Sequence, residues 1–210
     1  MPQLGWLIDL DKCTGCDSCA VACKSENNTR PLSSPMAFKP GGFLPDHVSY
    51  RWVVKKEAGV YPLPTLTFIT SACNHCEHPG CLAACPKASV HDPHNPDNAI
   101  FKRQEDGIVL INQDECIGCK RCIQACPYGA PQFNSATSLV EKCTFCVHRL
   151  YESDGTTRTG FQPACVTTCV GNALHLVEDF TLAESGLNAP DGFADKSLTV
   201  PAVKFATGPA

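Results

Sequence analysis

The sequence predicts an α+β fold of two nested units of short strands and helices, with a loop-and-hairpin insertion and an extended C-terminal tail. Two observations support this prediction. Sixteen of the 210 residues are cysteines, in four groups that each begin with Cys-x2-Cys and end with Cys-x3-Cys. Short stretches typical of strands separate the groups. The groups are Cys13, Cys16, Cys19, Cys23; Cys73, Cys76, Cys81, Cys85; Cys116, Cys119, Cys122, Cys126; and Cys143, Cys146, Cys165, Cys169.

The spacing inside the groups indicates iron–sulfur clusters. A disulfide framework needs no repeated ligand spacing, and a structural zinc ion usually takes its ligands from two separated pairs. Three thiols in one tight loop instead suit one face of a [4Fe–4S] cube. The fourth thiol, one helical turn later, is then free to bind a second cube, as in bacterial ferredoxins.

The N-terminal third should contain a strand, a helix and an insertion. Trp6–Leu10 predicts a short strand before the first cysteine loop, and Cys19–Lys24 can begin a helix. Residues 27–64 contain six prolines and a Gly-Gly pair, which predicts an insertion. Within it, Tyr50–Lys55 should form a strand that leads to a turn at Ala58–Gly59 and makes a small hairpin. The insertion serves either as a surface loop or as a surface for a partner.

The rest of the chain should alternate strands with the remaining cysteine groups. Residues 180–210 are polar, with scattered Gly and Pro, and predict an extended tail that contacts a partner. The expected strands are Thr65–Thr70, a short one near Ser89–His91, a hairpin of Ile100–Lys102 with Ile108–Ile111, and Ala173–Val177.

The groups must pair, because the fourth cysteine of each group binds the cluster of another group. Groups two and three share a proline after the last cysteine, at Pro86 and Pro127. They should form an inner unit, 65–138, while groups one and four form an outer unit, 1–26 plus 139–179. Four clusters then have these ligands: cluster A, Cys13, Cys16, Cys19 and Cys169; cluster B, Cys23, Cys143, Cys146 and Cys165; cluster C, Cys73, Cys76, Cys81 and Cys126; cluster D, Cys85, Cys116, Cys119 and Cys122.

Charge and hydropathy limit the partners. The formal net charge is −4, and four oxidised clusters with their thiolates would bring it to about −12. This balance argues against nucleic acid. No N-terminal signal and no apolar stretch of about 18 residues is visible, so we expect no membrane span within the chain.

Several motifs resemble the four-cluster iron–sulfur subunit of the molybdopterin oxidoreductase superfamily, such as the beta subunits of dimethyl sulfoxide, polysulfide, tetrathionate and arsenate reductases. These are Ile8–Cys16, Cys73–Pro79, Cys116–Cys122 and Ala125–Gln132. The resemblance implies electron transfer between a molybdenum or tungsten bis-pterin catalytic subunit and an integral-membrane quinone-binding subunit, or a soluble carrier. It implies that cluster A faces the catalytic subunit and D the other partner. Some relatives replace a third-group cysteine with tryptophan; all the cysteines are present here, so we expect four [4Fe–4S] clusters.

The same resemblance implies association with a membrane through partners, on the periplasmic side after co-export, with a cytoplasmic location as the alternative. A free polyferredoxin serving a hydrogenase or formate dehydrogenase is the alternative function, and a zinc or disulfide scaffold the third. We find no catalytic residues: nucleophile, phosphate-loop and dinucleotide motifs are missing from the sequence.

Histidines and cations near the cysteines have two interpretations. His75 and His78 are expected to be structural, because cysteine ligands suffice. A cation beside a cluster raises its potential by stabilising the reduced form, but it can equally be a solvated surface charge. The candidates are Lys24, Lys87, Lys120, Arg121 and Lys142.

Overall fold

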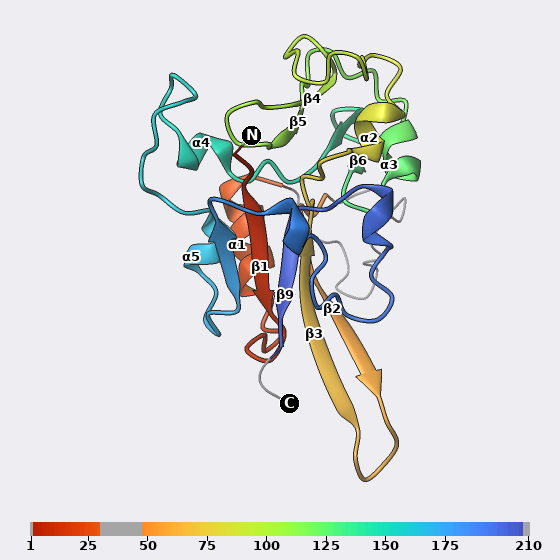
Figure 1. Cartoon of the computed structure of the whole chain (residues 1–210), viewed down its shortest axis with the longest axis vertical. Helices are drawn as coiled ribbons and strands as arrows, with labels where there is room; N and C mark the ends of the chain where they lie inside the picture. The colour runs from red at the N-terminus through yellow and green to blue at the C-terminus, as the bar shows by residue number, and fades with distance from the viewer. Residues whose placement is uncertain (1, 30–47, 208–210) are drawn as a thin grey trace.

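A three-stranded sheet joins the two ends of the chain in the computed structural model, which describes residues 2–29 and 48–207. Strand β1 (Gly5–Asp9) lies in the centre, antiparallel to β8 (Leu174–Val177) and parallel to β9 (Val203–Ala206) (Figure 1). Trp6 and Ile8 of β1 are buried. The sheet therefore holds the strand before the N-terminal cysteine loop against two later segments. One follows the fourth cysteine group, and the other is the end of the tail.

Four short helices carry cysteines and pack as two pairs. Helix α1 (Ser18–Glu26) packs on α5 (Ala164–Thr167), and α2 (Gly80–Ala83) packs on α3 (Arg121–Ala125). The first pair joins cysteine groups one and four, and the second joins groups two and three. The two pairs lie in different parts of the molecule (Figure 1).

Short hairpins support the second helix pair. Strands β4 (Ile100–Lys102) and β5 (Val109–Ile111) form the predicted hairpin, and β6 (Gln132–Asn134) pairs with β7 (Leu139–Glu141). Helix α4 (Val147–Leu150) follows the first two cysteines of group four. A small apolar cluster fills the space between these hairpins and the helices: Leu82, Ile100, Val109, Ile123 and Val140.

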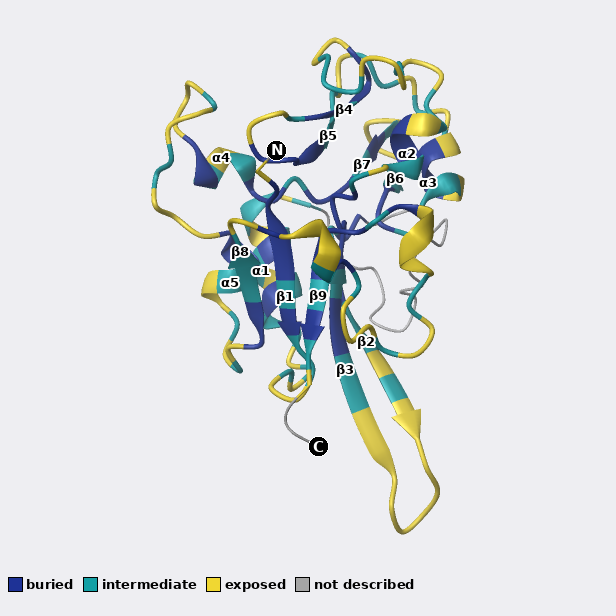
Figure 2. Cartoon of the chain, viewed as in Figure 1, coloured by how far each residue is buried: buried dark blue, intermediate teal, exposed yellow. Residues whose placement is uncertain are grey.

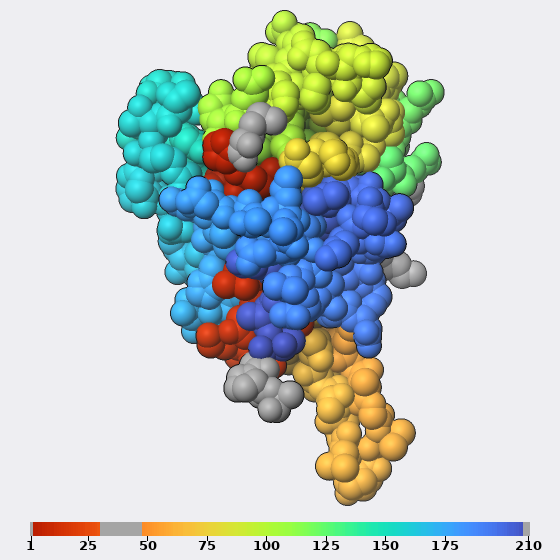
Figure 3. Space-filling view, viewed as in Figure 1, coloured from red at the N-terminus to blue at the C-terminus, as the bar shows by residue number. Residues whose placement is uncertain are grey.

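A long hairpin leaves the body of the molecule. Its strands are β2 (Arg51–Ala58) and β3 (Thr65–Ala72), and we call residues 51–72 the hairpin arm. The base of the arm is buried, whereas its end is exposed (Figure 2), and the space-filling view shows it projecting into solvent (Figure 3). The tip carries apolar side chains: Tyr61 is 94% exposed, Val60 80% and Leu63 79%.

Two predictions about the first half of the chain were wrong. No strand forms at Ser89–His91, where the backbone bends and turns instead. The hairpin is not contained within 27–64, because β2 pairs with β3, which lies beyond that boundary. The turn at Ala58–Gly59 is confirmed, with Gly59 at φ 81°. Residues 30–47 of the predicted insertion lie outside the described residues.

The prediction of an extended tail was also wrong. The segment from Phe180 folds back on the body through two 3-10 turns, Leu182–Glu184 and Lys196–Leu198, and ends in β9. Phe180, Val203 and Phe205 are buried, and Figure 3 shows the tail covering much of one face. The sequence does not reveal β9, because a strand of four residues is too short to show periodicity. Its partner β1 also lies at the other end of the sequence.

Candidate metal centres

Each of the four cysteine groups begins with the same kind of turn. The residue before the second cysteine has a positive φ in all four: Gly15 (68°), His75 (41°), Gly118 (65°) and Phe145 (60°). At Gly15 a side chain would also collide with Phe68, since a Cβ would lie 2.3 Å from its ring. In the fourth group the turn brings the backbone N–H of Phe145 to 3.4 Å from the sulfur of Cys143. The four groups therefore share local geometry as well as spacing.

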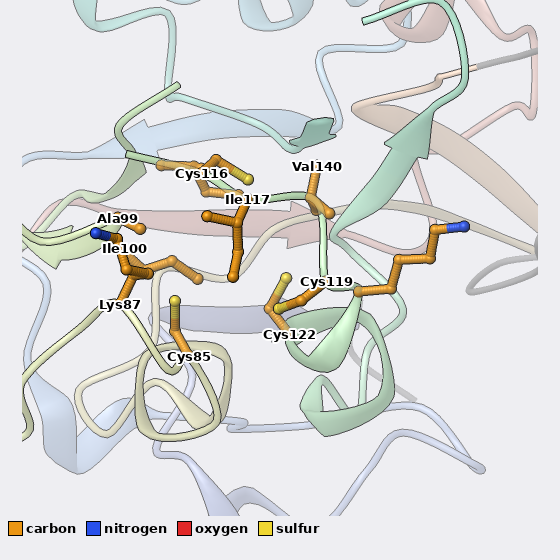
Figure 4. A pocket seen from close by; sticks show the side chains of 11 residues that line it. Cys85, Lys87, Ala99, Ile100, Cys116, Ile117, Cys119, Cys122 and Val140 are labelled. Atoms are coloured by element: carbon orange, nitrogen blue, oxygen red, sulfur yellow. The ribbon is translucent and has the colours of Figure 1, made fainter. Parts of the chain in front are cut away.

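The folded chain gathers the cysteines from different groups around shared cavities. Three small cavities of similar size are each lined by four cysteines. The lining cysteines are Cys13, Cys16, Cys19 and Cys169 (site A); Cys73, Cys76, Cys81 and Cys126 (site C); and Cys85, Cys116, Cys119 and Cys122 (site D). In site D, the sulfurs point toward one another (Figure 4).

The remaining cysteines, Cys23, Cys143, Cys146 and Cys165, also lie near one another, and we call them site B. Burial, followed by the neighbouring thiols Cys165 and Cys146, raises the pKa of Cys23 to about 12. Burial and Cys23 raise the pKa of Cys143 well above its usual value. Site B is the most enclosed of the four, because all its cysteines are buried.

The donor set fits [4Fe–4S] clusters better than zinc or disulfides. None of the sixteen cysteines forms a disulfide bond. Among the described residues, no three Cys, His, Asp or Glu side chains are arranged to hold one metal ion. A zinc ion would draw four sulfurs to about 2.3 Å from one centre, an arrangement that the described residues lack. Four thiolates are the usual ligands of a [4Fe–4S] core.

Backbone N–H groups supply positive charge to the sulfurs. The N–H of Ala173 lies 3.2 Å from the sulfur of Cys169. Burial raises the pKa of Cys126, whereas the backbone N–H groups of Ala130, Tyr128 and Gly129 act in the opposite direction and stabilise its thiolate. Without a cationic core, buried thiols of raised pKa stay protonated; the sites are therefore suited to a group that brings its own positive charge.

The four sites follow one another as A, B, C and D. Helix α1 carries Cys19 of site A and Cys23 of site B. Cys143 of site B lies close enough to Cys73 of site C for the two charges to interact. Sites C and D are joined by the packed helices α2 and α3. Only Cys16 and Cys119 are exposed, so the two terminal sites reach the surface, whereas site B is wholly buried and site C has three buried cysteines and the half-buried Cys126.

An aromatic stack lies where the two helix pairs meet. Trp6 stacks on Phe145 with ring centroids 3.9 Å apart, and Phe145 contacts His75 at 4.6 Å. The indole N–H of Trp6 donates to the carbonyl of Cys73 at 3.0 Å. The stack connects group four with group two, and two of its members, Phe145 and His75, have left-handed backbone conformations. Sequence reasoning missed it, because its members share no local motif.

The structure gives the two candidate histidines different surroundings. His75 is fully buried, and burial lowers its pKa well below the usual value, so the ring is neutral. Its Nδ1 accepts a hydrogen bond from the N–H of Val109 at 3.0 Å. His78 is exposed and lines none of the three cavities.

Two of the candidate cations lie at least partly inside the molecule. Lys142 is buried, and its ammonium donates to the carbonyls of Val109 and Cys143. Lys24 is half-buried and donates to the carbonyl of Val48 at 2.8 Å. Both are therefore held in place by backbone carbonyls.

The other three candidates lie nearer the surface. Lys87 forms an exposed ion pair with Glu115 and also lines the cavity of site D, so its contacts agree with both interpretations. The ammonium of Lys120 lies over the ring of Phe133, 3.7 Å from its centroid. Arg121 is exposed at the start of α3.

Comparison with known proteins agrees with this geometry. Two family models, both described as a 4Fe-4S dicluster domain, match residues 64–179 and 12–89. The chain is thus an iron–sulfur protein, and its two dicluster matches and sixteen cysteines correspond to four [4Fe–4S] clusters.

The relatives are subunits of reductases and dehydrogenases. The chain is 40% identical to a tetrathionate reductase subunit of Salmonella typhimurium, over 80% of this chain and 54% of the relative. It is 35% identical to a sulfite dehydrogenase subunit of Allochromatium vinosum (82% and 68%) and 34% identical to a selenate reductase subunit of Mesobacillus selenatarsenatis (83% and 60%). It therefore spans about half to two thirds of the length of these relatives. The chain belongs to the family of iron–sulfur electron-transfer subunits of molybdopterin oxidoreductases.

No helix in residues 2–29 and 48–207 is long and apolar enough to cross a membrane.

Proposed function

We propose that the chain conducts electrons through sites A, B, C and D between a molybdenum or tungsten bis-pterin catalytic subunit and a membrane quinone-linked subunit or soluble carrier. The proposed ligands are the four cysteines assigned to each site above, and the proposed units are the nested pairs of groups one with four and two with three. A [4Fe–4S] cluster supplies reversible one-electron chemistry. The chain itself performs no bond chemistry in this proposal.

The difference in exposure between terminal and middle sites carries the proposal. Electrons can enter or leave near Cys16 of site A and Cys119 of site D, which are exposed. The cysteines of site B are all buried, so the protein shields the intermediate site from solvent. Apolar side chains such as Ile100, Ile111 and Val140 line site D behind its exposed cysteine. This arrangement suits transfer between two partners on different surfaces.

The hairpin arm favours a docked subunit over a free polyferredoxin. Its tip exposes Val60, Tyr61 and Leu63 together, whereas a freely diffusing carrier gains nothing from an apolar projection. The base of the arm belongs to site A: Phe68 packs against Gly15 of the first cysteine loop, and Val53 lines the cavity of site A. A partner that covers the arm is therefore positioned beside the exposed edge of site A. We assign this side to the catalytic subunit and site D to the electron partner.

In this proposal, the partner subunits determine where the chain is located in the cell. Association with a membrane would come through an integral-membrane anchor subunit. The periplasmic side, after export with a partner, stays a prediction, as does a contact of the 180–210 tail with a partner.

Purification of the tagged complex from its native source tests the docked function. We expect molybdenum or tungsten and its pterin to co-elute with the wild-type chain. A double substitution at the tip, Tyr61→Ser with Leu63→Ser, should reduce the co-eluting metal at least several-fold while the iron content of the chain is unchanged. The control is Val90→Ser, which changes an exposed apolar residue elsewhere and should have no effect. A wild-type chain that elutes alone would contradict the proposal and favour the free carrier.

A further inference from the structure

Arg51, the first residue of β2, is a buried cation that sequence reasoning did not single out. Its side chain is part of the interior, with the residue 1% exposed. In the part of the chain that the structure describes, no carboxylate forms an ion pair with it. A buried charge without a counter-charge is strongly unfavourable. The residue therefore needs a negative partner of another kind.

The neighbours of Arg51 are the cysteines of sites A and B. Burial alone would lower its pKa, but the thiolates of Cys165, Cys19, Cys143 and Cys23 outweigh this effect and raise it. The first of these belongs to site B, the second to site A, and the other two to site B. The guanidinium also lies over the ring of Trp6, 4.5 Å from its centroid, which fixes it in place. Helix α1, which carries Cys19 of site A and Cys23 of site B, packs on β2, so Arg51 lies between the two sites of groups one and four.

The guanidinium still has donors to offer. Nη1 donates to Thr70 Oγ1 at 2.9 Å, but Nε and Nη2 have no hydrogen-bond partner. Two unpartnered donors on a fully buried arginine are rare, since buried polar groups normally find partners. Anionic sulfur on either side is the kind of acceptor that would satisfy them.

Thr70 extends the contact to site A. Its Oγ1 accepts from Arg51, so its own hydrogen is free to point to the sulfur of Cys19, 3.3 Å away. A thiolate ligand carries no hydrogen, which leaves Thr70 as the donor of this pair. Hydrogen bonds to ligand sulfur stabilise the reduced, more negative state of a cluster.

We propose that Arg51 is a charge-compensating residue that raises the reduction potentials of both sites A and B, and that Thr70 adds to this effect at site A alone. Each electron that a site accepts adds one negative charge, and a permanent cation beside it stabilises that state. No proton is exchanged, because arginine stays protonated. The inference rests on the ligand assignment given under the proposed function.

Redox titration of the anaerobic, iron-loaded protein, followed by electron paramagnetic resonance, tests the proposal. Cys169→Ser and Cys146→Ser first identify the signals of sites A and B. Arg51→Gln should then lower the potentials of A and B and leave those of C and D unchanged. Arg51→Lys, which keeps the charge, should stay closer to wild type. Thr70→Val should lower the potential of A only. Lys56→Gln, on the same strand but farther toward the tip, should shift none of them.

The outcomes distinguish an error in the ligand assignment from an error in the role of Arg51. If Cys169→Ser and Cys146→Ser do not remove different signals, the ligand assignment is wrong whatever Arg51 does. If they do, and Arg51→Gln leaves both potentials at the wild-type values, the charge role of Arg51 is overturned. A shift equal in Arg51→Gln and Arg51→Lys would likewise overturn it, since packing and not charge would be the cause. Should neither variant load iron, Thr70→Val decides: an unchanged potential of site A contradicts the proposal.

Discussion

Cys122 and Cys126 provide a sharp test of how the sites are shared between groups. They are four residues apart in the third cysteine group. Cys122 is in α3 and lines site D with Cys85, whereas Cys126 lines site C with Cys81. If each cysteine group bound one cluster by itself, substitution of Cys122 or of Cys126 would damage the same cluster. The structure predicts that they damage different ones.

The size of the effect follows from the number of ligands. Losing one of four thiolates should cost a site one to four irons, so the anaerobic protein should fall from about sixteen irons per chain to between about twelve and fifteen. Cys126→Ala should give the same low-temperature spectrum as Cys81→Ala. Cys122→Ala should match Cys85→Ala instead. Iron analysis and electron paramagnetic resonance of the four variants make the comparison without any prior assignment of signals.

Two results would refute this reasoning. One is a common spectrum for Cys122→Ala and Cys126→Ala that differs from those of both Cys81→Ala and Cys85→Ala, because it would mean that the third group binds a cluster by itself. The other is a wild-type iron content near twelve or fifteen, which would contradict four complete cubes. Val90→Ala, at an exposed position outside the cysteine groups, serves as a neutral control.

Two further predictions concern the contacts that join the groups. Phe145→Ala should destabilise the fold by about 3–5 kcal/mol, because it empties a fully buried position in the stack with Trp6. The visible absorbance of the clusters should then bleach at a lower urea concentration. The control Phe161→Ala, at an exposed site, should change the free energy of unfolding by about 0.5 kcal/mol or less. Glu26 accepts from His148 and Arg149, and these contacts lower its pKa below the usual 4.5. Its contribution, at most about 1 kcal/mol, is thus complete above pH 4.5 and lost as the pH falls through the lowered value. Glu26→Gln should therefore lower the urea midpoint by a small amount at pH 6 and by less at pH 4, where the carboxyl begins to be protonated; a difference that is larger at pH 4 than at pH 6 would contradict the assignment.

Local spacing was enough to predict the cysteine chemistry. A Cys-x2-Cys turn brings its thiols together through a few backbone angles, and the positive φ at Gly15 and Gly118 is a local property that glycine favours. The fourth cysteine follows one helical turn later, so its separation from the loop is also local. These features depend on neighbours in sequence, and the sequence displays them directly.

The hairpin and the tail show where local reasoning fails. Thr65–Thr70 was predicted as a strand, and β3 confirms it, but the hairpin was expected to close within 27–64 and instead pairs β2 with β3. Strand β9 has four residues, of which only Val203 and Phe205 are buried. Their burial is decided by β1, almost 200 residues earlier, and pairing over such a separation leaves no trace in a short pattern.

What the sequence by itself determined was the cluster type and the family, because these depend on residue identity and short-range spacing. Only the tertiary structure decided that Arg51 lies between sites A and B, that Trp6, Phe145 and His75 form one stack, and that the hairpin arm begins at site A. In the sequence, Arg51 stands in the stretch Tyr50–Lys55, which predicts a strand but gives no sign that this side chain is buried. Its burial arises from packing among distant segments, and so does the electrostatic role that we propose for it.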